Sequence, residues 1–410
     1  MNAKNVDLEI FDTEVTFESL GLNEKILKGV DAAGFNHPTV IQSTLIPQSL
    51  DGHDILGQSR TGSGKTAAFG LPALHLIEEE DSYGGLILVP TRELAIQVAK
   101  EMESLGKFTN LTVVPIYGGQ KIGTQITKLE KRPQIIVGTP GRVMDLPQRG
   151  HLPYNNIKLA ILDEVDRMLD IGFREDIRKI LGHLKQKHQT IFVSATISDE
   201  IKRLAKKYMN NPKSIDVTES SGSLTVAQVS QEYVTVQPWD KQKLLYHVLS
   251  TDEPHMTLIF CKTKATVDKL AKFLTSKNVE TAAIHGDMQQ SKRNKVMTAL
   301  RKGNLQTLIA SDLAARGIDV DGVTHVFNFD LPNEPESYVH RIGRTARAGK
   351  SGRAIAFCDE SEGAYLRDIE RLTGVALQVV DEHEYHHAAA QPPPLKVGRQ
   401  RRPEPAKSRP

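Results

Sequence analysis

Short apolar segments alternate with helical stretches along most of this chain. The first set lies at residues 54–59, 84–90, 111–117, 134–140, 158–164 and 189–196. Most of these segments lack a polar face, and strands that are apolar on both faces fit a parallel sheet covered by helices on both sides. The alternation restarts after residue 228, at 256–263, 280–286, 306–312, 324–330 and 352–358. The sequence therefore predicts an α/β protein with two domains.

Size and composition agree with this organisation. With 410 residues the chain exceeds the length at which one hydrophobic core usually stops growing. No apolar run approaches the ~20 residues that a membrane helix needs, so no membrane association is expected. The N-terminal residues are acidic and have no apolar stretch, which argues against a cleaved secretory signal and predicts a cytoplasmic location. Cys261 and Cys358 lie in apolar runs and are predicted to be buried free thiols.

Two stretches interrupt the alternation. Residues 214–228 are polar and contain Ser, Thr and Gly, which predicts a linker between the domains. Residues 381–410 hold proline and charge that cannot supply a core, so a disordered basic tail is predicted, with His383, His386 and His387 as incidental members. The tail would attract phosphate groups, although a solubilising terminus explains its composition equally well.

Residues 59–66, SRTGSGKT, nearly match the phosphate-binding loop G-x-x-x-x-G-K-[S/T], with Ser59 in place of the first glycine. The strand exit at this position needs a small side chain, which serine provides. Backbone N–H groups of such a turn point at phosphates while the following helix favours their charge. Lys65 would pair with the β and γ phosphates, and Thr66 would ligate Mg²⁺. The predicted cradle consists of Gly62, Ser63, Gly64, Lys65 and Thr66.

A carboxylate pair follows an apolar strand in LAILDEVDRM. Asp163 would lie near Mg²⁺, and Glu164 would orient or deprotonate the attacking water. Farther along, Arg341, Arg344 and Arg347 recur at three-residue spacing. If Arg344 and Arg347 reach across a cleft as arginine fingers, hydrolysis requires the two domains to close. The alternative is a basic helix with surface arginines.

Together these motifs resemble the DEAD-box RNA helicases of helicase superfamily 2, with the box spelled Asp163-Glu164-Val165-Asp166. The resemblance covers roughly residues 16–375 and is closest to a bacterial housekeeping member. It also includes Phe17, Gln42, PTREL (90–94), Gly118-Gly119, TPGR (139–142), SAT (194–196), LIFCKTK (258–264), HGDM (285–288), SDLAARGID (311–319) and HRIGRTAR (340–347).

The resemblance implies two tandem RecA-like parallel-sheet domains with a cleft between them. An N-terminal extension would occupy residues 1–16, RecA-like domain 1 residues 17–213, and the linker residues 214–228. RecA-like domain 2 would occupy residues 229–380, ahead of the tail at 381–410. ATP and Mg²⁺ are the implied ligands of the cleft.

Further site residues follow from the resemblance alone. Gln42 would hydrogen-bond the adenine edge and Phe17 would stack on the base, while Asp319 would lie near the ribose. Ser194 and Thr196 would link the ATP site to domain closure through hydrogen bonds to the Asp166 region. Asp312 and His340 are implied to take part in the same coupling at the cleft.

RNA contacts are expected at the carboxyl ends of strands, where binding sites of open α/β sheets collect. Small residues let backbone amides approach phosphates, and arginines add charge. No aromatic platform for reading bases is present, so binding independent of sequence is predicted, and the preference for RNA over DNA rests on the resemblance. The expected contacts are Arg92, Gly119, Thr139, Gly141 and Arg142 in domain 1 and Gly286, Asp287, Arg293 and Arg316 in domain 2.

The chain departs from the family pattern at a few positions. Ser59 stands where the family usually has alanine, and Ser311 stands where threonine is common. Val165 replaces the middle alanine of the box, and overpacking there would cost ~1–3 kcal/mol if its pocket is tight. Since both carboxylates remain, we expect activity to be retained, with altered coupling between the domains.

The sequence thus predicts an RNA-stimulated ATPase that separates short duplexes. A remodeller of RNA–protein complexes, or an ATP-dependent clamp, would use the same chemistry. An RNA-binding adaptor with a decayed ATPase is disfavoured by the intact motifs, and a DNA translocase by Gln42 and the 163–166 box. RNA is the expected partner of a monomeric enzyme, with ribosomal or RNA-decay proteins as further candidate partners.

Overall fold

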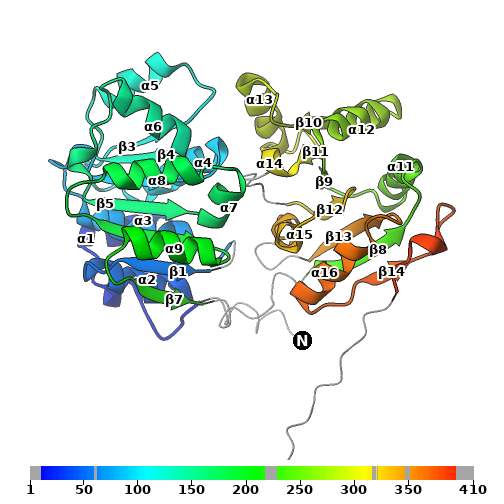
Figure 1. Cartoon of the computed structure of the whole chain (residues 1–410), viewed down its shortest axis with the longest axis horizontal. Helices are drawn as coiled ribbons and strands as arrows, with labels where there is room; N and C mark the ends of the chain where they lie inside the picture. The colour runs from blue at the N-terminus through cyan, green and yellow to red at the C-terminus, as the bar shows by residue number, and fades with distance from the viewer. Residues whose placement is uncertain are drawn as a thin grey trace, which may run out of the picture.

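The computed structural model describes residues 11–59, 62–217, 229–315, 320, 322–346 and 351–393. These residues form two lobes that lie side by side (Figure 1), each built around a seven-stranded parallel sheet. The prediction of two parallel-sheet α/β domains is therefore confirmed. Within the described ranges, no helix combines the length and the hydrophobicity needed to cross a membrane.

The first sheet has the strand order β3-β4-β2-β5-β6-β1-β7. Its strands are β1 (Ile55–Gln58), β2 (Gly85–Leu88), β3 (Val113–Ile116), β4 (Ile135–Gly138), β5 (Leu159–Asp163), β6 (Gln189–Ser194) and β7 (Lys213–Asp216). Its helices are η3 (Phe17–Leu20), α1 (Glu24–Ala32), α2 (Val40–Leu50), α3 (Lys65–Leu76), α4 (Arg92–Leu105), α5 (Ile122–Leu129), α6 (Pro140–Gln148), η4 (Tyr154–Asn156), α7 (Val165–Asp170), α8 (Arg174–His183) and α9 (Asp199–Tyr208).

Alternate residues of each central strand feed two separate cores. On β2, Ile87 packs with helices α1 to α4 on one face of the sheet, whereas Leu86 and Leu88 pack with α6 to α9 on the other. All four residues of β2 are buried, as are all five of β5. The strands lack a polar face because both of their faces are covered by helices.

The second sheet has the order β10-β11-β9-β12-β13-β8-β14, which repeats the order of the first sheet strand for strand. Its strands are β8 (Val229–Thr235), β9 (Thr257–Cys261), β10 (Thr281–Ile284), β11 (Thr307–Ser311), β12 (His325–Asn328), β13 (Gly352–Cys358) and β14 (Gln378–Val380). The accompanying helices are α11 (Lys241–Asp252), α12 (Lys264–Ser276), α13 (Gln290–Arg301), α14 (Asp312–Ala315), α15 (Pro335–Ile342), α16 (Gly363–Thr373) and η5 (Ala388–Ala390).

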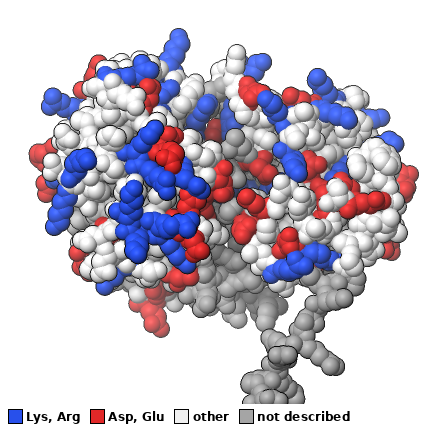
Figure 2. All heavy atoms as spheres, viewed as in Figure 1, with Lys and Arg blue, Asp and Glu red and all other residues white. Residues whose placement is uncertain are grey.

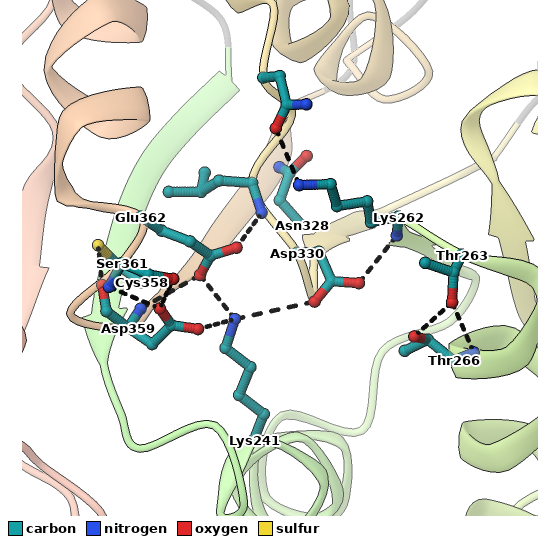
Figure 3. A network of polar contacts seen from close by, with 12 residues as sticks. Lys241, Lys262, Thr263, Thr266, Asn328, Asp330, Cys358, Asp359, Ser361 and Glu362 are labelled. Carbon is teal, nitrogen blue, oxygen red and sulfur yellow. Dashed lines mark hydrogen bonds and ion pairs between the residues drawn. The ribbon is translucent and has the colours of Figure 1, made fainter.

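A buried ionic network joins the carboxyl edge of the second sheet to the start of α11 (Figure 3). Nζ of Lys241 lies 2.6 Å from Glu362, 3.0 Å from Asp359 and 3.8 Å from Asp330. The lysine side chain is 4% exposed. Burial opposes its charge, but Glu362 and Asp359 outweigh burial and raise the pKa of Lys241. The network therefore fixes the ends of β12 and β13 against α11.

Two expected domain boundaries need correction. Residues 214–216, which we expect to begin the linker, belong to β7 at the edge of the first sheet. The expected disorder of residues 381–410 is wrong for 381–393, which pack against the second lobe, where Ala390 is 2% exposed. His386 Nδ1 lies 2.9 Å from the Thr235 hydroxyl, and Arg367 donates to the carbonyl of Pro392 at 2.6 Å. Residues 394–410 lie outside the described residues.

Candidate functional site

The turn before α3 has the backbone of a phosphate-binding loop. Gly62 and Gly64 have φ angles of +83° and +84°, and Gly64 directly precedes the helix. A Cβ atom on Gly64 would lie 2.4 Å from Nε2 of Gln42, so a larger residue would displace the Gln42 amide in addition to straining the backbone. Helix α3 begins at Lys65, and the unpaired N–H groups of a helix N-terminus favour anions. Residues 60 and 61 of the predicted loop lie outside the described residues.

Ser59 is accommodated at the strand exit. Its side chain is fully buried, and its hydroxyl lies 2.5 Å from the hydroxyl of Ser63. The carbonyl of Ser59 accepts a hydrogen bond of 2.8 Å from Nζ of Lys65. Thr66 lies half-buried on the first turn of α3. Serine is thus small enough for this position, and its hydroxyl adds a contact within the loop.

Asp163 and Lys65 are both buried at the carboxyl edge of the first sheet. Oδ1 of Asp163 has no hydrogen-bond partner among the described residues. Burial, together with the charge of Glu164, raises the pKa of Asp163 to about 7. Burial also lowers the pKa of Lys65, although the two carboxylates oppose this shift. A buried carboxylate oxygen without a donor is a ligand that Mg²⁺ prefers, so Asp163 fits the predicted metal site.

Glu164 has an unusual backbone conformation and a partner that the sequence does not reveal. Its φ and ψ angles are 54° and 52°, in the left-handed region that residues other than glycine seldom adopt. Its Oε2 accepts a hydrogen bond of 3.0 Å from Arg167, whose side chain is 3% exposed. Strained backbone of this kind clusters at functional sites. Arg167 was missed because i,i+3 spacing after a carboxylate is common in ordinary helices.

The hydrogen bonds expected between the SAT motif and the box are present. Thr196 donates to Oδ2 of Asp166 from its backbone N–H at 2.9 Å and from its hydroxyl at 3.1 Å. The hydroxyl of Ser194 accepts from the N–H of Asp166 at 3.2 Å. Val165 is fully buried in the apolar cluster on that face of the sheet. Asp166 therefore links the start of α7 to the end of β6.

The arginines of the second lobe differ in their surroundings. Arg341 is 2% exposed and forms a bidentate ion pair with Asp312, with N–O distances of 2.6 and 2.7 Å. It also donates to Asn328 and to the carbonyl of Asp330. All three guanidinium nitrogens take part in these contacts, so Arg341 holds α15 in place. The predicted coupling residue Asp312 therefore has its ion-pair partner, Arg341, within its own lobe.

A small pocket between the lobes contains Arg344. Arg167 from α7 lines it on the side of the first lobe, and the second lobe contributes Phe260, Asp312, Ser337, His340, Arg341 and Arg344. Arg344 and Arg167 therefore face a common space, and Arg167 also contacts Glu164. This arrangement brings a predicted finger residue and the predicted coupling residue His340 to the same pocket as Arg167, the partner of Glu164. Arg347 lies outside the described residues.

Gln42 and Phe17, the two residues expected to contact adenine, are both buried in the protein. The Gln42 amide donates to the carbonyl of Gly64 at 3.0 Å and accepts from the N–H of Thr39 at 2.9 Å. It therefore ties α2 to the phosphate loop. Phe17 is 3% exposed, with its ring centroid 6.1 Å from that of Phe35. Base recognition by both residues stays a prediction, as does the ribose contact of Asp319, which is not among the described residues.

The predicted RNA residues of the first lobe lie at the carboxyl ends of neighbouring strands. A Cβ atom on Gly119 would lie 2.1 Å from Nη1 of Arg92, so the arginine covers this glycine, whose φ angle is +84°. Thr139 directly precedes α6, the helix that carries Gly141 and Arg142. The guanidinium of Arg142 donates to the carbonyl of Gln120 at 3.3 Å. The loops after β2, β3 and β4 thus form one surface.

The second lobe requires one correction. Arg293, which we expect to contact RNA, is 8% exposed, and its Nε lies 2.5 Å from Oε1 of Glu93 in the first lobe. It therefore joins the two lobes and is covered where an RNA contact would need exposure. Gly286 is exposed, and Asp287 forms an ion pair with Lys264. Arg316 lies outside the described residues.

Comparisons with known proteins agree with this geometry. The DEAD/DEAH box helicase model matches residues 39–204, and the helicase conserved C-terminal domain model matches residues 240–349. The DEAD-box ATP-dependent RNA helicase CshA of Bacillus cereus is 45% identical over 359 residues, which cover 87% of this chain and 68% of that protein. The structure of S. cerevisiae Dbp5 bound to RNA and ADP BeF3 superposes with a TM-score of 0.81 and 33% identity, over 89% of this chain and 95% of Dbp5.

The arrangement of the lobes is closer to one state of Dbp5 than to another. A Dbp5 variant bound to a Gle1 variant and IP6 gives a TM-score of 0.70 at 32% identity, over 89% of this chain and 94% of Dbp5. The RNA-bound form gives the higher score over the same share of this chain. In this arrangement Glu93 and Arg293 form an ion pair between the lobes. By its sequence, fold and motifs, the chain belongs to the DEAD-box family of ATP-dependent RNA helicases.

Proposed function

We propose that this chain hydrolyses ATP in the cleft between its lobes, in response to RNA, and separates short RNA duplexes locally. The observation that carries this proposal is the grouping of buried Lys65 and Asp163 with Glu164 at one sheet edge, where Arg167 links Glu164 to the pocket that holds Arg344. These residue types at one edge fit phosphoryl transfer, which depends on positioning and on charge stabilisation.

Each residue has a distinct part in this reaction. Lys65 pairs with the terminal phosphates, and Glu164 orients or deprotonates the attacking water. Arg344 and Arg347 stabilise charge that develops on the γ-phosphate, which makes closure a condition for hydrolysis. Thr66 and Asp163 would hold Mg²⁺, partly through water. The ion would neutralise charge on the phosphate oxygens when bound.

Two contacts support the proposed coupling to RNA. Asp166 joins the box to the SAT motif through Ser194 and Thr196. Glu93 pairs with Arg293 of the other lobe, directly beside the predicted RNA residue Arg92. RNA that binds at the first lobe can therefore favour closure. Because binding linkage is reciprocal, RNA should tighten ATP binding and ATP should tighten RNA binding.

The steady-state ATPase rate with single-stranded RNA, single-stranded DNA and no nucleic acid tests the proposal. Strong stimulation by RNA alone is expected, and the Glu164→Gln protein should bind both ligands without turnover. An equal rate under all three conditions would contradict the coupling. A cytoplasmic monomer that acts on RNA without sequence preference is the setting that we propose, with ribosomal or RNA-decay proteins as candidate partners.

A further inference from the structure

Helices α8 and α9 form a strongly basic face of the first lobe. Residues 174–207 contain nine lysine or arginine residues against four acidic ones, whereas the net charge of the whole chain is only +2. All nine are exposed, and Figure 2 shows the basic side chains gathered on the face that these two helices cover. They are Arg174, Arg178, Lys179, Lys185, Lys187, Lys202, Arg203, Lys206 and Lys207. Positive charge is therefore concentrated here far beyond the average of the chain.

A pocket of about 210 Å³ lies between the two helices. It is lined by Arg174, Arg178, Glu200, Arg203, Leu204 and Lys207. The i,i+4 spacing of the basic residues within each helix places them on one helix face, and both faces meet at the pocket. Its volume is several times the roughly 30 Å³ of one water molecule. The two helices thus shape a hollow with basic walls over the buried side chain of Leu204.

The positive charge in this pocket is only partly compensated. Arg174 forms an ion pair with Glu200, the one carboxylate that lines the pocket, and Arg178 pairs with the exposed Glu175. In the described part of the chain, neither Arg203 nor Lys207 has a carboxylate partner. Exposed ion pairs contribute at most about 1 kcal/mol, so an anion can compete for these arginines. Planar guanidinium groups match phosphate oxygens in a bidentate fashion.

The pocket lies next to the predicted RNA surface of the first lobe. Helix α8 packs against α6, the helix that carries Gly141 and Arg142. A Cβ atom on Gly141 would lie 3.9 Å from Oδ2 of Asp176 on α8. Asp176 is two residues from Arg174 and from Arg178, so it points to the opposite side of the helix. The pocket is thus separated from Gly141 by about one helix diameter, ~10 Å.

We propose that the pocket between α8 and α9 binds a backbone phosphate of RNA that continues beyond the TPGR surface. It provides a second contact, independent of sequence, that retains the strand outside the cleft. This inference rests on the proposed function, because it assumes that RNA occupies the surface of Arg92 and Arg142. An acidic protein segment would use the same charges, but the adjoining RNA surface favours a nucleic-acid occupant.

The test compares two triple variants of the full chain that lose the same charge. One is Arg178→Gln, Arg203→Gln and Lys207→Gln. The control, Lys25→Gln, Lys28→Gln and Lys107→Gln, changes exposed lysines away from α8 and α9. The affinity for single-stranded RNAs of about eight and about thirty nucleotides is measured over a range of salt, with the RNA-stimulated ATPase rate.

The pocket variant is expected to bind the long RNA about tenfold more weakly at low salt, with a salt slope reduced by about 2. Its affinity for the short RNA and its maximal ATPase rate should match those of the unmodified protein. An equal loss in the control, a loss independent of salt, or unchanged affinity for the long RNA would overturn the proposal. Binding of polyglutamate, an acidic polypeptide, is measured in parallel. If the pocket variant loses polyglutamate binding but keeps its RNA affinity, the proposal is overturned and the pocket is assigned to a protein partner.

The same measurements separate this inference from the proposed function. If RNA stimulates the unmodified protein but the pocket variant binds long RNA normally, only the pocket proposal fails. If neither RNA binds to or stimulates the unmodified protein, the proposed function fails and the pocket proposal fails with it.

Discussion

Glu93 of α4 and Arg293 of α13 form an ion pair between the two lobes, with 2.5 Å between Oε1 and Nε. Both side chains are 10% exposed. Burial lowers the pKa of Arg293, and the charge of Glu93 opposes this shift. Glu93 directly follows Arg92, whose guanidinium covers Gly119 on the predicted RNA surface. The contact between the lobes and the predicted RNA contact are therefore neighbours.

Glu93→Gln and Arg293→Gln are expected to reduce RNA-stimulated ATP hydrolysis to a similar extent, by more than tenfold. Loss of one partner leaves the other charge buried without compensation, and such truncations cost about 2–5 kcal/mol at interfaces. The exchanged pair, Glu93→Arg with Arg293→Glu, should recover part of the rate. Arg301→Gln, an exposed change on the same helix, is the control. If Arg293 contacts RNA directly, only its own substitution will weaken RNA binding, and the exchange will restore nothing.

Lys65→Ala and Glu164→Gln should separate binding from chemistry. Lys65 is expected to pair with phosphates, so its loss should weaken ATP binding. Glu164 is expected to act on the attacking water, so Glu164→Gln should bind ATP and RNA yet hydrolyse at least a hundredfold more slowly, within the usual range for acid–base groups. Equilibrium binding of a fluorescent nucleotide, beside single-turnover hydrolysis, distinguishes the two. Equal loss of nucleotide affinity in both variants would contradict the assigned roles.

Arg344→Ala and Arg341→Ala should fail for different reasons. Arg344 lines the pocket between the lobes, so its loss should lower kcat far more than ATP affinity, because finger charge acts in the transition state. Arg341 is buried and pairs with the partly exposed Asp312, so its loss should lower the free energy of unfolding by about 1–3 kcal/mol. Denaturant unfolding and steady-state kinetics of both variants check this. A stable Arg341→Ala protein with lowered kcat would reverse the assignment.

How much the sequence predicts depends on how local the signal is. The strand before the predicted phosphate loop and the glycine turn that opens α3 are set by neighbouring residues, and both are found where we expect them. The three arginines at three-residue spacing look alike in sequence. Arg341 differs from Arg344 because it pairs with Asp312, which lies directly after β11 and is distant in the sequence. The pair of Glu93 and Arg293 joins residues of different lobes, so no local pattern can reveal it.

Segments that pack only on surfaces formed elsewhere escape prediction in the same way. Residues 381–393 lack the periodicity of a helix or strand, yet they pack on the surface of the second lobe, which is formed by residues earlier in the chain. Comparison of the two sheets shows that Lys241 occupies the position in the second lobe that Lys65 occupies in the first. It is the first residue of α11, after β8, as Lys65 is the first residue of α3, after β1. Carboxylates of the protein surround Lys241, whereas Lys65 is expected to meet phosphates.

Lys241→Met is expected to lower the free energy of unfolding of the second lobe by about 3–5 kcal/mol, because Asp330, Asp359 and Glu362 would lose their shared cation. Lys243→Met, on the same helix, removes the pair that this exposed lysine forms with Asp240, and it should lower stability far less than Lys241→Met. Urea unfolding followed by circular dichroism measures both changes. Similar stability of the two variants would show that the buried network contributes little.

Two truncations at the end of the chain should have different effects on RNA binding and on stability. Deletion of residues 394–410 should leave stability unchanged and weaken RNA binding mainly at low salt, since it removes basic residues. Deletion of 381–410 also removes Ala390, whose carbonyl lies 3.9 Å from Sγ of Cys358. Burial raises the pKa of the Cys358 thiol to about 12, so this thiol should be inert in the full chain.

The longer deletion should therefore lower the melting temperature and make Cys358 react with a thiol reagent under native conditions. The Cys261→Ala background, which leaves Cys358 as the only cysteine, makes the readout specific. The shorter deletion serves as the matched control for loss of the basic end. If both truncations leave stability and thiol reactivity unchanged, residues 381–393 do not protect the second lobe, and their packing contributes little to its stability.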